Sequence, residues 1–514
     1  MTSCKPNRRE VVIGMAAATA IPAISSAKSM TPKSGGVLKI SHSTRIATLN
    51  VMKLSGPAEY PCVDMLYSGL TRIAPGNNAA DPDLATDWEA NEDASEFTFN
   101  LRQGVTFHDG TPFTSADVVA TYSAILDAEF GSPARSVLDV IEAVEAVGIH
   151  AVRFKLNAPY ADLPISTAHA NARIVSAAAL AGDLNDLEIK PNGTGPFKLE
   201  SYDSSRITRL VRFNDYYKEG QPHLDAVEMH LFPDLTAETA NYLSGEVDVM
   251  LNVQQADYAR ISDAPGSNAL RVPSGRYVNV VMRQDQAPFD DVRVRKALAM
   301  SIDRQLLVDL VLEGLGRPAN DNILSPEFQY VIHSPEIPYD PAAAKALLAQ
   351  AGHPNGLKIE MAASNRPAIR GQVAIAIKEM ARPAGFDIDV KAMPHDTYLA
   401  NVWRKGNFYM AYWGMQPTED ATFNLLLTST ASYEDTGWHN AEFDDLVRRG
   451  RSISDPTERA AIYAKAQEIQ LRDTPYIIAM YQDVLTASRD VVHGWSVHPL
   501  NRVFYVEDVW LDRG

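Results

Sequence analysis

The residues with the clearest chemical potential lie between positions 398 and 438, where aromatic side chains alternate with polar ones. Tryptophan offers a broad apolar face and one N–H donor, which suits stacking on a small polar ligand. We therefore predict that Trp403 and Trp413 line a binding site, while Phe408 and Phe423 belong to the core. The aromatic residues of this stretch, which include three of the chain's six tryptophans, are Tyr398, Trp403, Phe408, Tyr409, Tyr412, Trp413, Phe423, Tyr433 and Trp438.

Catalytic signatures are missing from the sequence. It contains no G-x-S-x-G, H-E-x-x-H, C-x-x-C or phosphate-binding G-x-x-x-x-G-K-[ST] motif. Its 12 histidines are scattered, and none is paired with a carboxylate at a metal-binding spacing. The glycines of Gly193-Thr194-Gly195-Pro196 predict a tight turn beside a strand, since a dinucleotide loop needs a third glycine. We predict a protein that is not an enzyme and holds no cofactor or metal.

Composition and charge narrow the class further. The 514 residues exceed what one hydrophobic core supports, so two or three lobes are expected. Hydrophobic residues make up 46% of the chain and charged residues 22%, as in soluble globular proteins. The 47 basic and 64 acidic residues give a net charge of −17, which disfavours nucleic-acid binding. A small-molecule ligand is compatible with this balance.

The N-terminal segment predicts export. Lys5, Arg8 and Arg9 precede a largely apolar stretch from Val11 to Ile24, and small residues end it at Ala27. This is the layout of a secretory signal, and the apolar stretch is too short for a stable membrane anchor. The Arg8-Arg9 pair resembles a twin-arginine signal, with an ordinary Sec signal as the alternative. We expect cleavage near Ala27 and a periplasmic protein.

Strand and helix patterns alternate along the chain, which predicts an α/β fold. The alternation at 97–101 predicts a strand, and Thr114 with Asp117 forms a capping box that starts a helix over 114–126. Further helices are predicted over 291–302, from Asp340-Pro341 to Gly352, and from Asp455-Pro456 onward. These elements are interpreted as scaffold. No Gly/Ser linker separates them, so the lobes should be joined by chain crossings.

Several motifs in a fixed order resemble family 5 of the bacterial extracellular solute-binding proteins, which are oligopeptide, dipeptide and nickel receptors of ABC importers. The motifs are DLATDWE at 83–89, FTFNLRQGVTFHDGTPFTSADV at 97–118, GTGPF at 193–197, SGEVD at 244–248, PFDDVRVRKAL at 288–298, and Asp340-Pro341 with Leu347-Leu348 and Ala351-Gly352. The resemblance extends over nearly the whole chain after the signal segment, from about Gly36 to about Asp508.

The resemblance implies a two-lobed clamp of the periplasmic-binding-protein type with an extra third domain, in which the ligand is enclosed between the lobes by hinge closure. After a signal peptide at 1–27, lobe I would comprise 28–57, 192–274 and 487–514. The extra domain would be 58–191, and lobe II would be 275–486. The implied partners are a small ligand and the permease subunits of an ABC transporter, with the protein itself a monomer.

The resemblance also implies ligand-binding positions in lobe II. In peptide-binding relatives an aspartate just after a Gly-Trp pair holds the ligand's amino group. Trp413 matches the tryptophan here, but Gln416 stands at the aspartate position, and an amide cannot form that charge-assisted bond. Glu419 or Asp420 would replace the aspartate, or the ligand lacks a free amine.

Two further regions carry predicted contacts. Arg370, with Arg366 as its rival, lies near the position at which relatives hold the ligand's carboxylate. Glu59 and Tyr60 fall in a segment of the first-lobe side that contacts the ligand in relatives.

These observations predict the periplasmic substrate-binding component of an ABC importer for a peptide or peptide-like solute. The alternative within the family is a receptor for an opine-like conjugate or a sugar derivative, a choice that depends on Gln416. A sensing module that hands its ligand to a signalling receptor, and a secreted hydrolase, are the alternatives from other classes.

Overall fold

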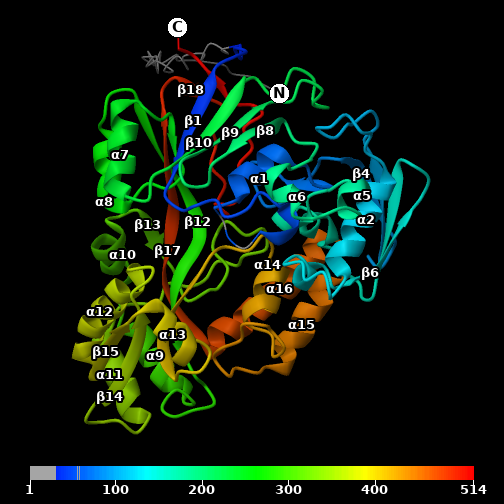
Figure 1. Cartoon of the computed structure of the whole chain (residues 1–514). Coiled ribbons are helices and arrows are strands. Elements are labelled where there is room, and N and C mark those ends of the chain that lie inside the picture. Colours follow the sequence, from blue (N-terminus) through cyan, green and yellow to red (C-terminus); the bar gives the residue numbers. More distant parts are fainter. Residues whose placement is uncertain (1–30, 55, 57, 514) are drawn as a thin grey trace, which may run out of the picture.

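The computed structural model describes residues 31–54, 56 and 58–513. The predicted signal segment and its cleavage site therefore lie outside the described residues. Two lobes and a third body surround the centre of the molecule (Figure 1). Within the described residues, no helix has the length and apolar character that crossing a bilayer requires. The predicted α/β clamp with an extra domain is confirmed.

A single mixed sheet extends through both lobes. Its strands follow the order β15 (Phe386–Met393), β14 (Leu357–Ser364), β16 (Phe408–Trp413), β12 (Ser267–Met282), β17 (Tyr476–Arg489), β11 (Val249–Met250), β1 (Val37–His42), β10 (Ala226–Leu231), β9 (Ile207–Arg212) and β8 (Phe197–Tyr202), and the short β13 (Gly316–Pro318) pairs with β17.

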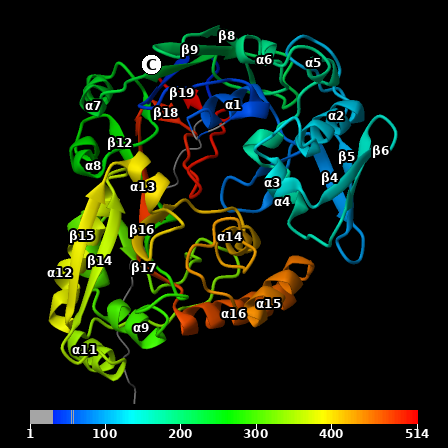
Figure 2. The same ribbon diagram turned by 60° about the horizontal axis from the view of Figure 1, so that its bottom comes forward.

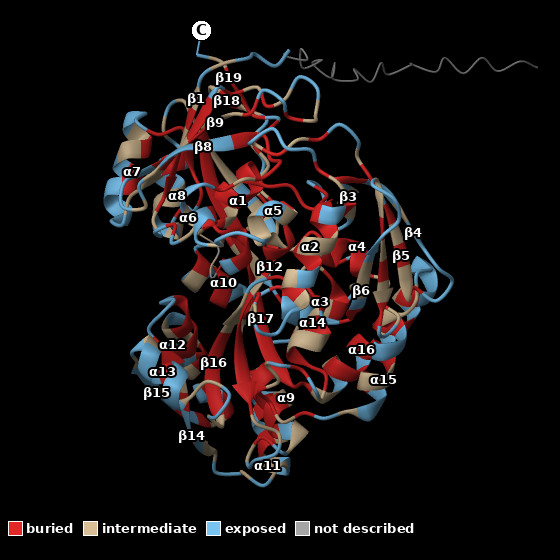
Figure 3. Ribbon diagram, turned by 45° about the vertical axis from the view of Figure 1, so that its right-hand side comes forward, coloured by how far each residue is buried: buried red, intermediate tan, exposed pale blue. Residues whose placement is uncertain are grey.

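The long strands β12 and β17 connect the two lobes (Figure 1). They pair antiparallel from Ser267 opposite Arg489 to Val281 opposite Tyr476, and the register shifts between Val272 and Arg276. A bulge of this kind bends a strand locally. β17 is buried over almost its full length (Figure 3). The chain crossings expected in place of a linker are therefore these two paired strands.

Lobe I consists of β8–β11 and β1 with the helices around them. Helix α7 (Leu235–Ser244) packs against β1 and β11, and α8 (Gln255–Ser262) packs against β12 and β17. Helix α1 (Tyr60–Leu66) lies against β8, where Gly195 permits close contact, because a Cβ there would lie 2.4 Å from the Met65 carbonyl oxygen. Residues 193–196 lead into β8 with a bend at Gly195-Pro196, so the tight turn predicted there is replaced by a close backbone approach to α1. The small strands β18 (Val492–His493) and β19 (Trp510–Leu511) pair nearby.

The third body is built on a four-stranded antiparallel sheet in the order β4 (Ala85–Ala90), β5 (Glu96–Leu101), β7 (Ala151–Leu156) and β6 (Ile141–Ala146). Helix α2 (Ser115–Leu126) covers it, with Tyr122 packed edge-on to Phe154 at 4.8 Å between ring centroids. The hydrophobic core runs without a break from β1 of lobe I into this sheet. Its other elements are β2 (Thr71–Ile73), β3 (Ala80–Pro82), α3 (Arg135–Leu138), α4 (Leu163–Ser166), α5 (Ala177–Leu180), α6 (Asp186–Ile189) and the 3-10 turns at Val51–Lys53 and Ala170–Ala172.

Lobe II has two hydrophobic cores, one on each side of its part of the sheet. Helix α12 (Ile369–Ala381) covers β14, β15 and β16, and α15 (Ala441–Arg451) packs on α16 (Pro456–Asp473) and α14 (Glu419–Leu426) (Figure 2). The remaining elements are α9 (Val292–Met300), α10 (Arg304–Leu312), α11 (Pro341–Gln350), α13 (His395–Asn401) and the 3-10 turn Arg382–Ala384.

The helix starts predicted from the sequence are confirmed by their caps. Thr114 and Asp117 form the complete capping box of α2. The carboxylates of Asp291, Asp340 and Asp455 each accept a backbone N–H at the start of α9, α11 and α16. The proposed domain boundaries at 274/275 and 486/487 fall inside β12 and β17, so they cut the sheet within strands rather than in loops.

A buried carboxylate in lobe I predicts that stability falls as pH rises. Glu238 on α7 is 2% exposed and accepts a bond of 2.8 Å from the Ser41 hydroxyl. Burial raises its pKa to about 7, although the Ser41 bond opposes the shift. The folded state therefore binds more protons than the unfolded state between pH 4.5 and 7, and the contribution of this group to stability declines across that window.

Glu238→Gln is therefore expected to raise the free energy of unfolding at pH 8 by about 1–2 kcal/mol and to change it little at pH 5. Urea unfolding at the two pH values measures the effect. Glu246→Gln, at an exposed position just after α7, is the matched control. An equal gain for Glu238→Gln at both pH values would show that ionisation of Glu238 is not its cause.

Candidate ligand-binding site

A cleft of about 650 Å³ separates the third body and the C-terminal segment from lobe II. One wall comes from residues between Tyr60 and Arg173, the other from residues between Arg404 and Arg451, and Arg502 with Val503 closes one side. The volume lies within the range of sites that enclose small molecules. Its lining combines aromatic, amide and charged side chains, so it suits a polar ligand of moderate size.

The aromatic wall of the cleft centres on Tyr433. Trp403 stacks on Tyr433 with ring centroids 5.6 Å apart, and Trp413 meets it edge-on at 5.4 Å. Tyr433 lines the cleft, whereas neither tryptophan is among the lining residues. The structure thus brings each predicted tryptophan against Tyr433, and Tyr433, which the sequence did not single out, is the one of the three that lines the cleft. Phe408 and Phe423 are buried in the core, as predicted.

The polar segment after Trp413 divides into cleft and core residues. Gln416 lines the cleft, and its Nε2 donates to the Gly414 carbonyl at 3.3 Å. Asp420, in the first turn of α14, also lines the cleft. Glu419 lies away from it and accepts the Tyr330 N–H at 2.6 Å. Of the two carboxylates predicted to replace the missing aspartate, only Asp420 reaches the cleft.

Asp420 is held in an unusual electrostatic setting. Its side chain is 3% exposed and lies 3.8 Å from Arg451 Nε, and Asn424 Nδ2 donates to it at 2.9 Å. Burial raises its pKa above the usual range of an aspartate, while the Arg451 charge opposes the shift. A ligand cation beside Asp420 would favour its carboxylate form.

The arginine predicted to bind a carboxylate is not in the cleft. Arg370, on α12, is 8% exposed, and its guanidinium lies 5.2 Å from the Tyr398 ring centroid. Its rival Arg366 is exposed and also lies outside the lining. The lining contains four other arginines from distant segments, which are Arg173, Arg404, Arg451 and Arg502. No local motif marks these positions, and only the fold brings them together.

The first-lobe pair also separates into one lining and one buried residue. Tyr60, at the start of α1, lines the cleft. Glu59 is 2% exposed and accepts the Ala47 N–H at 3.2 Å. It therefore supports the loop before α1, and Tyr60 carries the contact surface.

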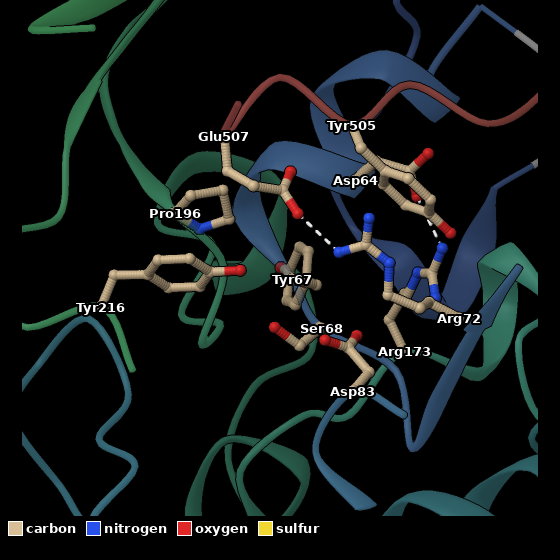
Figure 4. Close-up of a pocket in the computed structure, with 10 residues that line it drawn as sticks. All are labelled: Asp64, Tyr67, Ser68, Arg72, Asp83, Arg173, Pro196, Tyr216, Tyr505 and Glu507. Carbon is tan, nitrogen blue, oxygen red and sulfur yellow. Dashed lines mark hydrogen bonds and ion pairs between the residues drawn. The ribbon is translucent and has the colours of Figure 1, made fainter. Parts of the chain in front are cut away.

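A network of buried charges ties the C-terminal segment to the third body and to lobe I, and Figure 4 shows most of its members. Arg72 pairs with Glu507, and Lys218 donates to the same carboxylate at 2.9 Å. Arg173 Nη2 pairs with Asp64 at 2.7 Å, and Asp64 also accepts the Phe504 N–H at 2.9 Å. These bonds hold the segment from Phe504 to Glu507 at its two ends, shortly after Arg502.

No metal-binding cluster of three or more His, Cys, Asp or Glu side chains occurs in residues 31–54, 56 and 58–513. Cys62 is buried and free, and burial raises the pKa of its thiol to about 12. It is thus a neutral core side chain at physiological pH.

Residues 79–435 match the family model described as bacterial extracellular solute-binding proteins, family 5 middle. The glutathione-binding protein GsiB of Shigella dysenteriae is 26% identical over 432 residues, covering 81% of this chain and 83% of that protein. The dipeptide-binding protein of Escherichia coli K12 is 27% identical over 470 residues, covering 85% and 87%. The structure of AgaA from A. tumefacien R10 in complex with agropinic acid superposes with a TM-score of 0.77 at 26% identity, covering 93% of this chain and 99% of that one.

Proposed function

This chain belongs to family 5 of the bacterial extracellular solute-binding proteins of ABC transporters, a non-catalytic family, and we propose that it captures a peptide or peptide-like solute in the periplasm and delivers it to a membrane permease. The observation that carries this proposal is the cleft between lobe II and the third body with the C-terminal segment, whose wall offers Tyr433, Gln416 and Asp420 to one small polar solute.

Hinge closure supplies the capture step. In the part of the chain that the structure describes, β12 and β17 are the paired strands that run from one lobe to the other. Bending near the register shift at Val272–Arg276 would therefore move the lobes as bodies. A solute that contacts both walls binds the closed form better and shifts the population toward it. The permease would then distinguish a loaded receptor from an empty one by its closed shape.

The solutes of the relatives define the class to be tested. They include glutathione, dipeptides and agropinic acid, as those proteins are named. A receptor for an opine-like conjugate is the second candidate, and Gln416 favours it, because a neutral amide suits a solute without a free α-amino group. Asp420 favours a peptide, because its carboxylate lies in the cleft wall.

Uptake of labelled peptides and of agropinic acid by a strain that lacks the gene tests the proposal. We expect uptake of one of these solutes to fall, and to return with the gene. Unchanged uptake together with lost chemotaxis toward the same solute would assign the protein to sensing. Turnover of the solute by the purified protein would assign it to hydrolysis.

Tyr433→Ala is expected to weaken solute binding about tenfold, because it removes the ring at the aromatic wall and leaves Trp403 and Trp413 without their contact. Tyr433→Phe retains the ring and should bind within about twofold of the original protein. Isothermal titration with the solute identified by uptake measures both affinities. Equal affinities for Tyr433→Ala and the original protein would place the solute elsewhere.

A further inference from the structure

The charged side chains of the cleft wall are not balanced. Four arginines line it, against two carboxylates, Asp139 and Asp420. Arg173 is paired with Asp64 outside the lining, and Arg451 lies beside Asp420. Arg404 stacks on Tyr433 with its guanidinium carbon 5.6 Å from the ring centroid. Arg502 is the remaining cation, and it has no carboxylate partner in the described part of the chain.

Arg502 is partly buried and largely unused by the protein. Its Nη2 donates to the Met415 carbonyl at 3.3 Å, the one hydrogen bond of its side chain among the described residues. A guanidinium carries five N–H donors, so most of its bonding capacity is unfilled. Burial lowers the pKa of Arg502, and the nearby Tyr60 opposes this shift only in part. An unpaired buried charge is costly unless a partner arrives.

The groups around Arg502 are donors rather than competing anions. Tyr60 and His169 line the same cleft, and both lie close enough for the Arg502 charge to affect their pKa values. Burial raises the pKa of Tyr60, so it stays a neutral phenol with an O–H to donate. Burial lowers the pKa of His169 to about 4, and Arg502 adds to the shift. Its Nδ1 accepts the Asn171 N–H at 3.2 Å, which leaves the proton on Nε2.

Among the described residues, the remaining charged and titratable groups near Arg502 leave it without a competing anion. Arg173 lies in the same wall, and the charge of Arg502 also acts on His498, whose pKa burial lowers. Asp139 is exposed at the end of α3, and Asp420 is beside Arg451. The backbone of Arg502 is positioned by the bonds that Asp64 and Arg72 make to residues 504 and 507.

We propose that Arg502, Tyr60 and His169 form an anion-binding corner of the cleft, and that this corner selects solutes carrying a carboxylate. The planar fork of a guanidinium matches a carboxylate with two parallel hydrogen bonds. The acid end of the solute is then held by the first-lobe side and the C-terminal segment, rather than by Arg370 in lobe II. This inference rests on the proposed function, since it takes the cleft as the solute site.

The test uses the full exported protein, stripped of solute by unfolding and refolding, and small anions as probes. We compare its melting temperature in sodium succinate, in sodium sulfate and in sodium chloride at equal ionic strength. Succinate is expected to raise the melting temperature above the chloride value, and Arg502→Met is expected to abolish the increase. Arg502→Lys keeps the charge without the fork and should retain a smaller increase. Arg382→Met, at a side chain that is 81% exposed, is the charge-matched control.

A second arm uses isothermal titration. For each dipeptide or conjugate that binds, it compares the affinity of the free acid with that of the amide of the same solute. To the original protein, the amide should bind at least tenfold more weakly than the acid. The Arg502→Met variant should bind the acid and the amide with equal affinity. An equal increase of the melting temperature in succinate for the original protein and for Arg502→Met would contradict the proposed anion-binding corner. An increase in sulfate alone would overturn the carboxylate assignment in favour of a tetrahedral oxyanion. If succinate stabilises the protein through Arg502 but no peptide or conjugate binds, the corner stands and the proposed solute class fails.

Discussion

Replacing Asp162 with asparagine is expected to open the cleft and to weaken solute binding at least tenfold. Asp162 precedes α4 in the third body, and its carboxylate pairs with Arg459 Nη1 of α16 in lobe II at 2.6 Å. Both side chains are only 8% exposed. The pair therefore joins the two sides of the cleft through a nearly dry contact, apart from the hinge strands.

The size of the effect follows from the buried partner. Removing one member of a buried ion pair costs about 3–5 kcal/mol, since the other charge is left without compensation. In the open form Arg459 would meet water, so this cost falls on the closed form. A smaller closed population lowers the apparent affinity in proportion. Neighbouring contacts, such as the 2.9 Å bond from the Ala161 N–H to the Arg451 carbonyl, remain and limit the loss.

Isothermal titration measures the affinity, and small-angle scattering of the protein without solute measures its radius of gyration. Asp162→Asn should show the larger radius. Asp445→Asn is the control, because it removes the same charge from an exposed pair with Arg448 on α15. An unchanged affinity and radius for Asp162→Asn would mean that the pair does not hold the lobes together.

Replacing Glu507 with glutamine is expected to destabilise the fold by about 3 kcal/mol or more. Glu507 is the shared anion of Arg72 and Lys218, and Figure 4 shows its pair with Arg72. Burial alone would raise its pKa, but the two cations outweigh burial and lower the pKa to about 2. Glutamine keeps the shape but removes the carboxylate that both cations share, and it loosens the C-terminal segment that presents Arg502.

Urea unfolding at pH 7 measures this loss. Glu145→Gln removes one member of the pair with Lys155, whose side chains are 48% and 43% exposed, and should cost less than about 1 kcal/mol. Because the pKa of Glu507 is lowered on folding, its contribution is present above pH 4.5 and disappears as the pH falls toward 2. If the urea concentration at half-unfolding were the same for Glu507→Gln and Glu145→Gln, the assigned role of Glu507 as the shared anion of a buried network would be contradicted.

The sequence was sufficient for the parts of the structure that depend on local signals. The capping box at Thr114 and Asp117 and the aspartates before α9, α11 and α16 act within one turn of helix, so spacing alone locates them. The ordered motifs were sufficient to predict the family, and the family resemblance in turn predicted the two-lobed clamp.

The composition of the cleft depends on long-range placement and could not be obtained in this way. Arg502 lines the same cleft as Tyr60 and His169. The segment that carries Arg502 is held by Asp64, which accepts the Phe504 N–H, and by the pairs of Glu507 with Arg72 and Lys218. Trp413 has the residue type of a ligand-stacking wall, but the structure places its neighbour Tyr433, not Trp413, in the lining of the cleft. Glu419 and Asp420 are adjacent in sequence, yet the helix turns one into the core and the other into the cleft.

Native mass spectrometry of the protein purified from the periplasm without denaturation tests the central claim most directly. We predict a retained solute whose mass fits a short peptide or an acid conjugate, and its loss from both Tyr433→Ala and Arg502→Met. A ladder of amino-acid compositions would indicate a peptide receptor that uses Asp420, and a single discrete mass would indicate a conjugate read by Gln416. A retained molecule that carries no acid group and persists in both variants would contradict the account.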